Sequence, residues 1–396
     1  MSLDINTLKR PCFCCEGEDG SHIAVGSWSI AGIGKLDLTI RICSRCGAVL
    51  QDPVLNEKAM EFYYKNYSNY TNPGRGGLPS DDTLETDFRQ ISIIQKFLNP
   101  SRVFEIGCAT GNLLSKLKKV GWDVDGCDPS KTAADIAAKL WGINIQIGLF
   151  DDLSLDMQST DLVIISHVLE HIFKPLSTLK RVHNILSSEG HLLVEVPCLT
   201  NPEKWPNGYF TFEHINIFSK NILINCLLNA GFEPIYIDVK KDHSPYPVIL
   251  ILAKKSNHHS WQESKIDSPA QVKILIDEYL KSESSEWDRV DKLLINELKG
   301  FDKVIIWGGG IHTSQLFENT KALSNKKVIS IIDSDPQKKG LNIFGIKIDS
   351  PDSIFLKEKN VAVVISSHAF ENEIYDILSG GENLNAKIIR LYQRKS

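Results

Sequence analysis

The chain has 396 residues and a formal net charge of −5, from 44 basic and 49 acidic side chains. This length allows two or three domains, and the slight acidic excess argues against a nucleic-acid-binding surface. No 18 consecutive residues are apolar and the N-terminus lacks an apolar signal-peptide core, so we expect a cytoplasmic protein with no membrane partner. The nine cysteines are then expected to stay reduced.

Two Cys-x-x-Cys pairs stand near the N-terminus. They are Cys12 with Cys15 and Cys43 with Cys46. In a cytosolic chain such pairs predict a zinc ribbon, here over residues 1–55, in which four thiolates hold a structural zinc ion. Their separation exceeds the usual 15–20 residues, which a hairpin of strands at 22–28 and 35–42 would explain. Two unrelated thiol pairs, or a redox pair, are the alternative, and Cys14 is expected to be a spectator.

Residues 56–99 are predicted to be mostly helical, with a tyrosine-rich interruption from Tyr63 to Gly77. Glycine and proline favour mobility in this loop, and its tyrosines supply phenol donors. A lid over a cofactor and an acceptor is one interpretation. The other is an ordinary surface loop whose tyrosines pack on the helices.

The segment 103–114 reads as a buried strand, a tight glycine turn and the start of a helix. At Gly107 and Gly111 a Cβ would collide with an approaching ligand, and the helix start offers free N–H groups. A second strand, residues 122–127, ends at Asp128, 21 residues after Gly107. An acidic residue at this place can accept hydrogen bonds from both ribose hydroxyls of a nucleoside.

Two nucleoside cofactors fit this plan, a dinucleotide and S-adenosylmethionine (SAM). The turn reads Glu-x-Gly-x-x-x-Gly from Glu105 to Gly111, so it lacks the paired glycines that accommodate a pyrophosphate. Glu105 instead suits the ammonium group of the methionyl part of SAM. The segment resembles the nucleotide-binding core of class I SAM-dependent methyltransferases, with a glycine turn in another α/β domain as the alternative.

The next stretch extends this resemblance. A strand at 161–166, a helix beginning at Val168 and a strand at 191–196 that ends at Pro197 follow the methyltransferase pattern. The resemblance implies a doubly wound α/β sheet of the class I methyltransferase type, with SAM as cofactor. The residues that it implies at the cofactor are Glu105, Gly107, Cys108, Ala109, Gly111, Asp128, Pro129, Ser166 and His167. It favours structural or cofactor-lining roles over general-base roles for His167 and His171.

The methyltransferase domain is expected to span residues 56–256. Ser219 is predicted to cap a helix over 220–229. The strands expected after it are 233–239 and 248–253. Residues 257–299 are expected to form a helical connector, whose clearest helical pieces are 270–280 and 287–298.

A Rossmann-like α/β domain is predicted over residues 300–396. A strand at 303–307 leads into the glycine turn Gly308-Gly-Gly, and further strands are expected at 328–332, ending at Asp333, and at 361–366. The dinucleotide signal is weak, because Thr313 replaces the third glycine of the fingerprint and Asp333 comes 25 residues after Gly308. We expect a role other than binding NAD.

This order of parts resembles the three-domain SAM-dependent C-methyltransferases that act on nucleotide-linked deoxyketosugars. In that family a Tyr-His-Glu-His stretch leads into a serine at a helix start. Glu213 and His214 match its last two positions, whereas Thr211 and Phe212 differ from its first two. The resemblance implies that His214 is the general base and that Glu213 and a tyrosine help to hold the sugar. Here Tyr209 or Thr211 would supply the hydroxyl of that tyrosine. A structural pair preceding the helix cap is the alternative for Glu213 and His214.

The function implied is methylation of a sugar in carbohydrate biosynthesis, at a carbon next to a ketone or at oxygen. The expected substrate is a small molecule, a nucleotide-activated sugar, whose nucleotide the C-terminal domain helps to hold. The expected cofactors are SAM and zinc. The alternatives are methylation of another small metabolite, an NAD-dependent oxidoreductase using the C-terminal domain, and a non-catalytic partner protein organised by its zinc ribbon.

Overall fold

The computed structural model describes residues 6–30, 33–66, 81–240, 246–256, 266–324, 326–352, 360–368, 370–380 and 386–392. The chain divides into two compact units. The larger unit contains Asn6–Ile23 and Thr39–Asp277, and the smaller contains Ala24–Leu38 and Glu278–Ser396. The four-part division expected from the sequence stays a prediction. None of the helices in the described ranges is long and apolar enough to cross a membrane.

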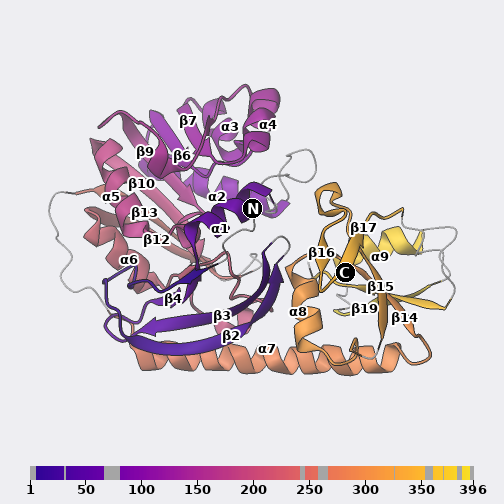
Figure 1. Ribbon diagram of the computed structural model, residues 1–396. Helices are drawn as coiled ribbons and strands as arrows, with labels where there is room; N and C mark the ends of the chain where they lie inside the picture. The colour runs from indigo at the N-terminus through magenta and orange to yellow at the C-terminus, as the bar shows by residue number, and fades with distance from the viewer. Residues whose placement is uncertain are drawn as a thin grey trace. The chain divides into compact units, whose positions relative to one another are not determined.

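A seven-stranded sheet forms the centre of the larger unit (Figure 1). In spatial order its strands are β12 (Phe232–Lys240), β13 (Val248–Lys255), β10 (Leu186–Pro197), β9 (Thr160–Ser166), β6 (Arg102–Ile106), β7 (Asp123–Asp128) and β8 (Gln146–Ile147). Strand β13 runs antiparallel to both of its neighbours, and the other neighbouring pairs are parallel. The predicted doubly wound methyltransferase sheet is confirmed.

The order of the strands defines where a ligand can bind. The chain builds β6, β7 and β8 outward in one direction and then returns to build β9 and β10 on the other side of β6. The carboxyl ends of β6 and β9 therefore flank a topological switch point. Open α/β sheets bind their ligands in the crevice at such a point.

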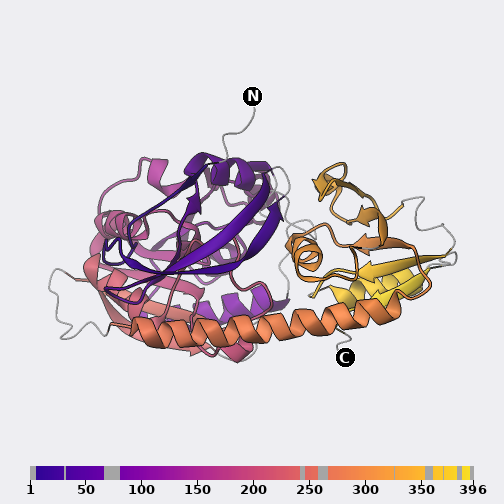
Figure 2. The same ribbon diagram turned by 60° about the horizontal axis from the view of Figure 1, so that its bottom comes forward.

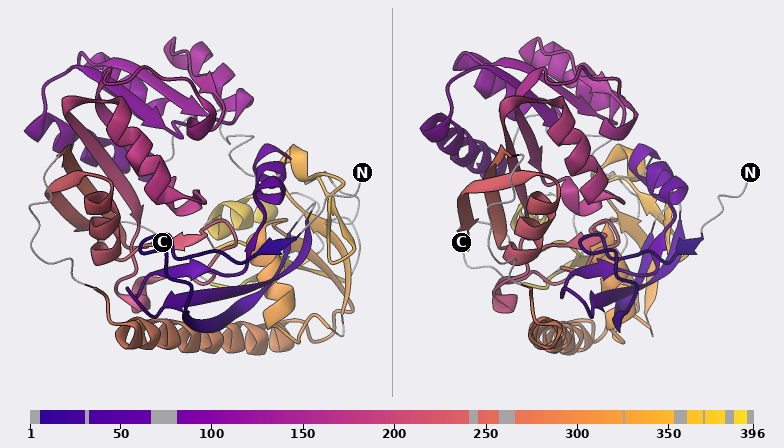
Figure 3. Two further views of the ribbon diagram at one scale, coloured as in Figure 1. Left: turned by 60° about the vertical axis from the view of Figure 1, so that its left-hand side comes forward. Right: turned by 90° about the vertical axis from the view of Figure 1, so that its left-hand side faces the viewer.

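Helices cover both faces of this sheet (Figure 3). One face packs on α2 (Asp81–Phe97), α3 (Asn112–Lys119) and α4 (Lys131–Trp141), and the other packs on α5 (Pro175–Ile185) and α6 (Lys220–Asn229). Alternate residues of a strand point to opposite faces. In β9, accordingly, Leu162 and Ile164 join the first core, and Val163 and Ile165 join the second.

The N-terminal segment forms a separate four-stranded sheet. Its order is β11 (Asn216–Ile217), β4 (Val49–Gln51), β3 (Gly34–Cys43) and β2 (Gly20–Ile30). The hairpin β2–β3 is longer than the predicted one. Two short strands, β1 (Thr7–Leu8) and β5 (Val54–Leu55), pair with each other before α1 (Glu57–Asn66). Because β11 comes from the segment predicted to be the methyltransferase domain, the predicted ribbon and that domain share a sheet.

The connector is one helix, α7 (Pro269–Glu297), rather than two pieces (Figure 2). The residues between the predicted pieces, 281–286, contain neither glycine nor proline, so nothing interrupts the backbone hydrogen bonds there. The Tyr279 hydroxyl donates to the Glu283 carboxylate at 2.8 Å across the same stretch. Periodicity alone missed this continuity, because these positions are polar.

The smaller unit has its own six-stranded sheet. In spatial order it contains β16 (Asn342–Ile343), β17 (Ile346–Asp349), β15 (Lys327–Ile332), β14 (Lys303–Trp307), β18 (Val361–Ile365) and β19 (Lys387–Arg390). Only the β16–β17 pair is antiparallel among these described neighbours. Helices α8 (Ile311–Asn319) and α9 (Glu371–Ser379) connect its strands.

Candidate active site

The glycine turn follows β6 as predicted, and the fold itself already requires its glycines. Gly107 and Gly111 adopt φ angles of +71° and +70°, a left-handed conformation that favours glycine. A Cβ at Gly107 would lie 2.4 Å from Cγ2 of Val168, and one at Gly111 would lie 3.3 Å from the Cβ of Ala137. A Cβ would therefore collide with the protein's own Val168 at Gly107 and crowd Ala137 at Gly111, and the expected collision with a ligand stays a prediction.

Asp128 ties the end of β7 to this turn. Its two carboxylate oxygens accept backbone hydrogen bonds from Ser130 at 2.8 Å and from Ala109 at 2.9 Å. The Ala109 N–H, expected near the cofactor, thus already has a partner. The thiol of Cys108 points into the core, where it donates to the carbonyl of Cys127 at 3.4 Å, and Pro129 is exposed.

Glu105 is buried at the carboxyl half of β6, with 6% of its surface exposed. Its Oε2 atom has no hydrogen-bond partner among the described residues. Burial raises the pKa of Glu105 to about 8, and the nearby carboxylates of Asp87 and Asp128 add to the increase. A cation brought to this oxygen would replace the lost hydration, so the site fits the ammonium group of SAM.

Ser166 and His167 end β9 at the switch point. The Ser166 hydroxyl accepts a hydrogen bond from the Gln90 amide at 2.8 Å. His167 has a φ of +53°, and its ring lies between two buried acids, 3.6 Å from Glu170 and 3.4 Å from Glu195. Although burial opposes protonation, these carboxylates raise the pKa of His167 to about 10.

The protonated His167 is therefore an internal counter-ion. Sequence reasoning missed its partner Glu195 and the Arg89 side chain, which also pairs with Glu195 and with Asp238. A signal was present, because Glu195 is the one acidic residue in the apolar run from Leu192 to Val196, in the second half of β10. An acid that is 1% exposed in such a strand requires a cationic partner.

The predicted catalytic segment lies between β10 and α6. Ser219 caps α6 as predicted, since its hydroxyl accepts from the Ile222 N–H at 3.1 Å. Burial, with a further contribution from His171, lowers the pKa of His214 to about 4. Burial raises the pKa of Glu213, opposed by His171 and by a hydrogen bond from Tyr63. Tyr209 is buried and stacks on Trp205 with ring centroids 4.5 Å apart.

A turn from the end of β9 brings more groups to His214. The predicted helix at Val168 is instead a short 3₁₀ turn, Leu169–His171, and α5 begins only at Pro175. A proline is favoured in the first turn of a helix, which explains this later start. The turn places the His171 ring 5.0 Å from the His214 ring, measured between centroids.

Glu170 lies in this turn and was not among the predicted site residues. It is 2% exposed, and neither of its oxygens has a hydrogen-bond partner within the described ranges. Burial alone would raise the pKa of Glu170, but the neighbouring imidazoles lower it to about 2, so the carboxylate is ionised. Ligand-type atoms of Glu170, His171 and His214 lie within 4.8 Å of one another. This cluster can accept a proton, a hydroxyl group or a cation.

Two tyrosines of α1 reach the same region. The Tyr64 hydroxyl lies 3.1 Å from Nδ1 of His171, and the Tyr63 ring packs edge-on against Phe212 at 4.8 Å between centroids. Both belong to the tyrosine-rich stretch for which we considered a lid. The rest of that stretch, residues 67–77, lies outside the described residues.

The four predicted zinc ligands lie together. Sγ of Cys12 is 3.6 Å from Sγ of Cys46, and Sγ of Cys15 is 3.5 Å from Sγ of Cys43. All four sulfur atoms lie within 4.8 Å of one another. In a tetrahedron with zinc–sulfur bonds of about 2.3 Å, sulfur atoms stand about 3.8 Å apart. The arrangement is compatible with a zinc ribbon, and the thiol of Cys14 interacts with Cys226 as well as with Cys46.

The glycine turn of the smaller unit has a similar internal geometry. Asp333 accepts backbone hydrogen bonds from Gly309 at 2.7 Å and Asp335 at 2.8 Å, and it also pairs with Lys338. Thr313 is fully buried, and its hydroxyl bonds back to the carbonyl of Gly308. Thr313, which stands at the third glycine position of the fingerprint, therefore stabilises the turn by bonding back to its first glycine.

Comparison with known families identifies the central part of the larger unit. Residues 86–237 match a family model described as "Methyltransferase domain", and residues 300–389 match one described as "C2185-like, N-terminal". Together with the sheet order, this match means that the chain contains a methyltransferase domain.

One curated relative is described as an uncharacterized methyltransferase of Staphylococcus carnosus strain TM300. It is 35% identical over 96 residues, which is 24% of this chain and 45% of the relative. The match thus spans less than half of that relative's length.

Similarity to solved structures is low. A 1,6-didemethyltoxoflavin-N1-methyltransferase of Burkholderia thailandensis, with bound 1,6-didemethyltoxoflavin and S-adenosylhomocysteine (SAH), is 15% identical and has a TM-score of 0.43. The similarity covers 56% of this chain and 96% of that one. A SAM-dependent methyltransferase of Methanosarcina mazei is 19% identical with a TM-score of 0.37, covering 42% and 98%. Nothing about the substrate follows from such scores.

Proposed function

We propose that this protein transfers a methyl group from SAM to a sugar, in nucleotide-activated form, at an oxygen or at a carbon next to a ketone. One observation carries the proposal of SAM binding. The Oε2 atom of Glu105 is buried without a partner in the described chain, at the carboxyl half of β6, inside the stretch that matches the methyltransferase family.

In this proposal three parts of the switch point bind the cofactor. Glu105 pairs with the ammonium group, Asp128 accepts from the ribose hydroxyls, and the turn between them brings the backbone close to the ligand. Asp128 can accept further bonds because each carboxylate oxygen has two lone pairs. The bound cofactor supplies an electrophilic methyl group.

His214 is the proposed general base. Because its pKa lies near 4, its imidazole is neutral at neutral pH and can take a proton from the acceptor. The ionised Glu170 beside it would stabilise the imidazolium that forms. Burial raises the pKa of Tyr209, so its phenol stays protonated and would donate to an acceptor oxygen.

The sugar substrate rests on the resemblance of the Glu213–His214 segment to the ketosugar enzymes. The test is product analysis by mass spectrometry after incubation with SAM and a panel of nucleotide-sugars, with and without a keto group. A mass gain of one methyl group on a nucleotide-sugar is expected. Methylation of other metabolites with none on any nucleotide-sugar would overturn this substrate class and leave the methyltransferase intact.

Carbon and oxygen acceptors are separated by one further experiment. With SAH in place of SAM, a carbon acceptor should exchange the proton next to its ketone with solvent deuterium, since the base still acts. Absence of exchange with intact methylation would indicate an oxygen acceptor.

An oxidoreductase using the smaller unit is the second candidate. It is less favoured because Lys338 already neutralises Asp333 and Thr313 closes the turn. Thermal unfolding with SAH and with NAD, measured in parallel, decides between them. We expect stabilisation by SAH alone.

We also propose that Cys12, Cys15, Cys43 and Cys46 hold one structural zinc ion. The site would be closed, since four thiolates complete a tetrahedron and leave no position for a substrate. The ion would stabilise the ribbon without taking part in methyl transfer.

A further inference from the structure

The Glu213–His214 segment has little regular structure of its own, so its backbone carbonyls depend on outside donors. Residues 209–215 form neither helix nor strand. The side-chain amide of Gln51 donates to the carbonyl oxygens of His214, at 3.1 Å, and of Thr211. Gln51 belongs to β4 of the ribbon and is 3% exposed.

A half-buried arginine of the ribbon, Arg10, holds the next residues. The guanidinium of Arg10 donates to the carbonyl of Ile215, to the side-chain oxygen of Asn216 at 2.9 Å, and to the carbonyl of Gln51 at 3.2 Å. Strand β11 then continues the contact, because Asn216 and Ile217 pair with β4. The residues from His214 to Ile217 are thus each bonded to Gln51, to Arg10 or to β4, all of which belong to the ribbon.

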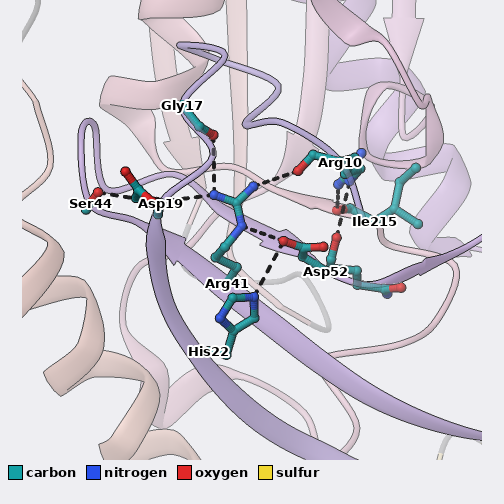
Figure 4. A network of polar contacts seen from close by, with 9 residues as sticks. Arg10, Gly17, Asp19, His22, Arg41, Ser44, Asp52 and Ile215 are labelled. Atoms are coloured by element: carbon teal, nitrogen blue, oxygen red, sulfur yellow. Dashed lines mark hydrogen bonds and ion pairs between the residues drawn. The ribbon is translucent and has the colours of Figure 1, made fainter. Parts of the chain in front are cut away.

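A second arginine, Arg41, connects Arg10 to the loop of residues 12–19, which we call the cysteine loop (Figure 4). Arg41 is fully buried and pairs with Asp52 at 2.6 Å. Its other nitrogens donate to the carbonyl of Arg10 at 2.7 Å and to the carbonyls of Gly17 and Asp19, which follow Cys15 by two and four residues. The contacts therefore run without interruption from the cysteine loop through Arg41 and Arg10 to Ile215.

The segment in turn fixes the 3₁₀ turn that carries Glu170. The Asn216 amide donates to the carbonyls of Leu169, at 3.1 Å, and Ile172, at 2.7 Å, which bracket Glu170 and His171. Nδ1 of His171 lies 2.9 Å from the carbonyl oxygen of Glu213. One set of ribbon contacts thus determines the backbone position of both halves of the acid–imidazole cluster.

We propose that the cysteine ribbon is a positioning device for the acceptor site, with Gln51 and Arg10 as the positioning residues that hold His214 in place. This inference rests on the proposed role of His214. In a solvent-exposed loop, water would hydrogen-bond to the backbone carbonyls, so the multiply bonded donors Gln51 and Arg10 would not be needed for that purpose. They limit the segment to one backbone conformation, which a group that must meet a reacting atom requires.

The test uses Gln51→Met and Gln51→Ala in the full chain. Methionine retains the volume of the side chain and removes both donors, whereas alanine removes volume as well. Gln146→Met is the matched control, because the Gln146 amide bonds only to the exposed Asp125 in the described structure, on the far edge of the sheet at β8. Hydrogen exchange of peptides covering 209–217, SAH affinity and turnover are measured for each.

Both Gln51 variants should exchange the amide protons of residues 209–217 at least tenfold faster than the wild type. Their SAH affinity should be unchanged, and their kcat should change by a larger factor than their KM for SAM. The control should match the wild type. Wild-type exchange in Gln51→Met would overturn the proposal, because then only volume matters. Faster exchange across the whole seven-stranded sheet would overturn it too, since it would indicate a general loss of stability.

The proposed function can fail separately. If no SAH binds, or no acceptor is methylated, the methyltransferase assignment fails while the exchange data still show whether the ribbon holds the segment. If methylation proceeds and exchange in the Gln51 variants is unchanged, only the positioning proposal fails.

Discussion

Nδ1 of His171 lies 2.9 Å from the backbone carbonyl oxygen of Glu213. A carbonyl oxygen can only accept, so Nδ1 carries the proton and donates it. In a neutral ring this leaves Nε2, 3.9 Å from Glu170, as the basic nitrogen. The relationship joins the turn after β9 to the segment after β10, and it sets the tautomer of an imidazole beside His214.

Glu105→Gln should weaken SAH binding and stabilise the free protein at alkaline pH. The carboxylate is replaced by a neutral amide, so an ammonium group loses a charged partner worth about 1.5–3 kcal/mol, or roughly 10- to 150-fold in affinity. Calorimetry with SAH measures this loss. Unchanged affinity in Glu105→Gln would remove Glu105 from the cofactor site.

The stability change follows from the raised pKa of Glu105. The folded pKa of about 8 exceeds the ordinary 4.5, so the folded state binds the proton more tightly and wild-type stability falls as pH rises from about 4.5 to 8. At about 1.4 kcal/mol per pKa unit, the loss amounts to a few kcal/mol. Glu105→Gln should lack this loss, as urea unfolding at pH 5 and pH 9 would show. An identical pH dependence in both proteins would contradict it.

Asp128→Asn should reduce both SAH affinity and stability. Asparagine has one acceptor oxygen, so either the Ala109 or the Ser130 N–H would face an amide donor. Leaving one buried donor unsatisfied costs about 1–3 kcal/mol. Asp123→Asn, at the exposed start of the same strand, is the control for both measurements. Gly107→Val is a poorer probe, since its side chain would meet Val168 even without a ligand.

His214→Ala should lower methyl transfer by about 100- to 10,000-fold, the usual contribution of a general base. Its SAH affinity should stay within twofold of the wild type, because the role proposed for His214 is at the acceptor and not at the cofactor. The two readouts are SAH calorimetry and steady-state kinetics on whichever substrate the product analysis identifies. Undiminished turnover would exclude His214 as the base and make Tyr209 the next residue to test.

The purified protein should contain one zinc ion per chain, and Cys43→Ser/Cys46→Ser should contain none. The four sulfur atoms already stand near tetrahedral spacing, so removing two ligands should abolish retention. Elemental analysis after preparation without chelator measures the content. Cys127→Ala, in the core of β7, is the control and should retain zinc; loss there, or retention in the double variant, would contradict the assignment.

Local sequence patterns predicted the helices and strands well, but they could not predict which segments distant in sequence pair with each other. The strand, glycine turn and helix from Arg102 to Lys119 follow from apolar periodicity and two glycines, and the structure has them there. The pairing of Asn216 with Leu50 joins residues distant in sequence, and no local signal indicates it. This pairing places β4 of the ribbon and β11 of the methyltransferase segment in one sheet, so the predicted boundary between the two domains does not separate their strands.

The site could be predicted only in part for the same reason. Glu105 and Asp128 end strands next to a recognisable turn, so their place at the switch point follows from sequence. The ionised Glu170 and its imidazole neighbours meet through folding of the turn after β9 onto the segment after β10. Their pKa values depend on burial and mutual distance, which a sequence does not contain.

The most direct test of the central claim is calorimetric titration of the wild-type protein with SAH at pH 7, in several buffers of different ionisation enthalpy. With a pKa of about 8, Glu105 is mostly protonated in the free protein at pH 7. Pairing with the ammonium group would ionise it, so we expect one SAH per chain and the release of close to one proton. Glu105→Gln should release none. Binding without proton release would contradict the role of Glu105, and no SAH binding in any buffer would contradict the methyltransferase assignment itself.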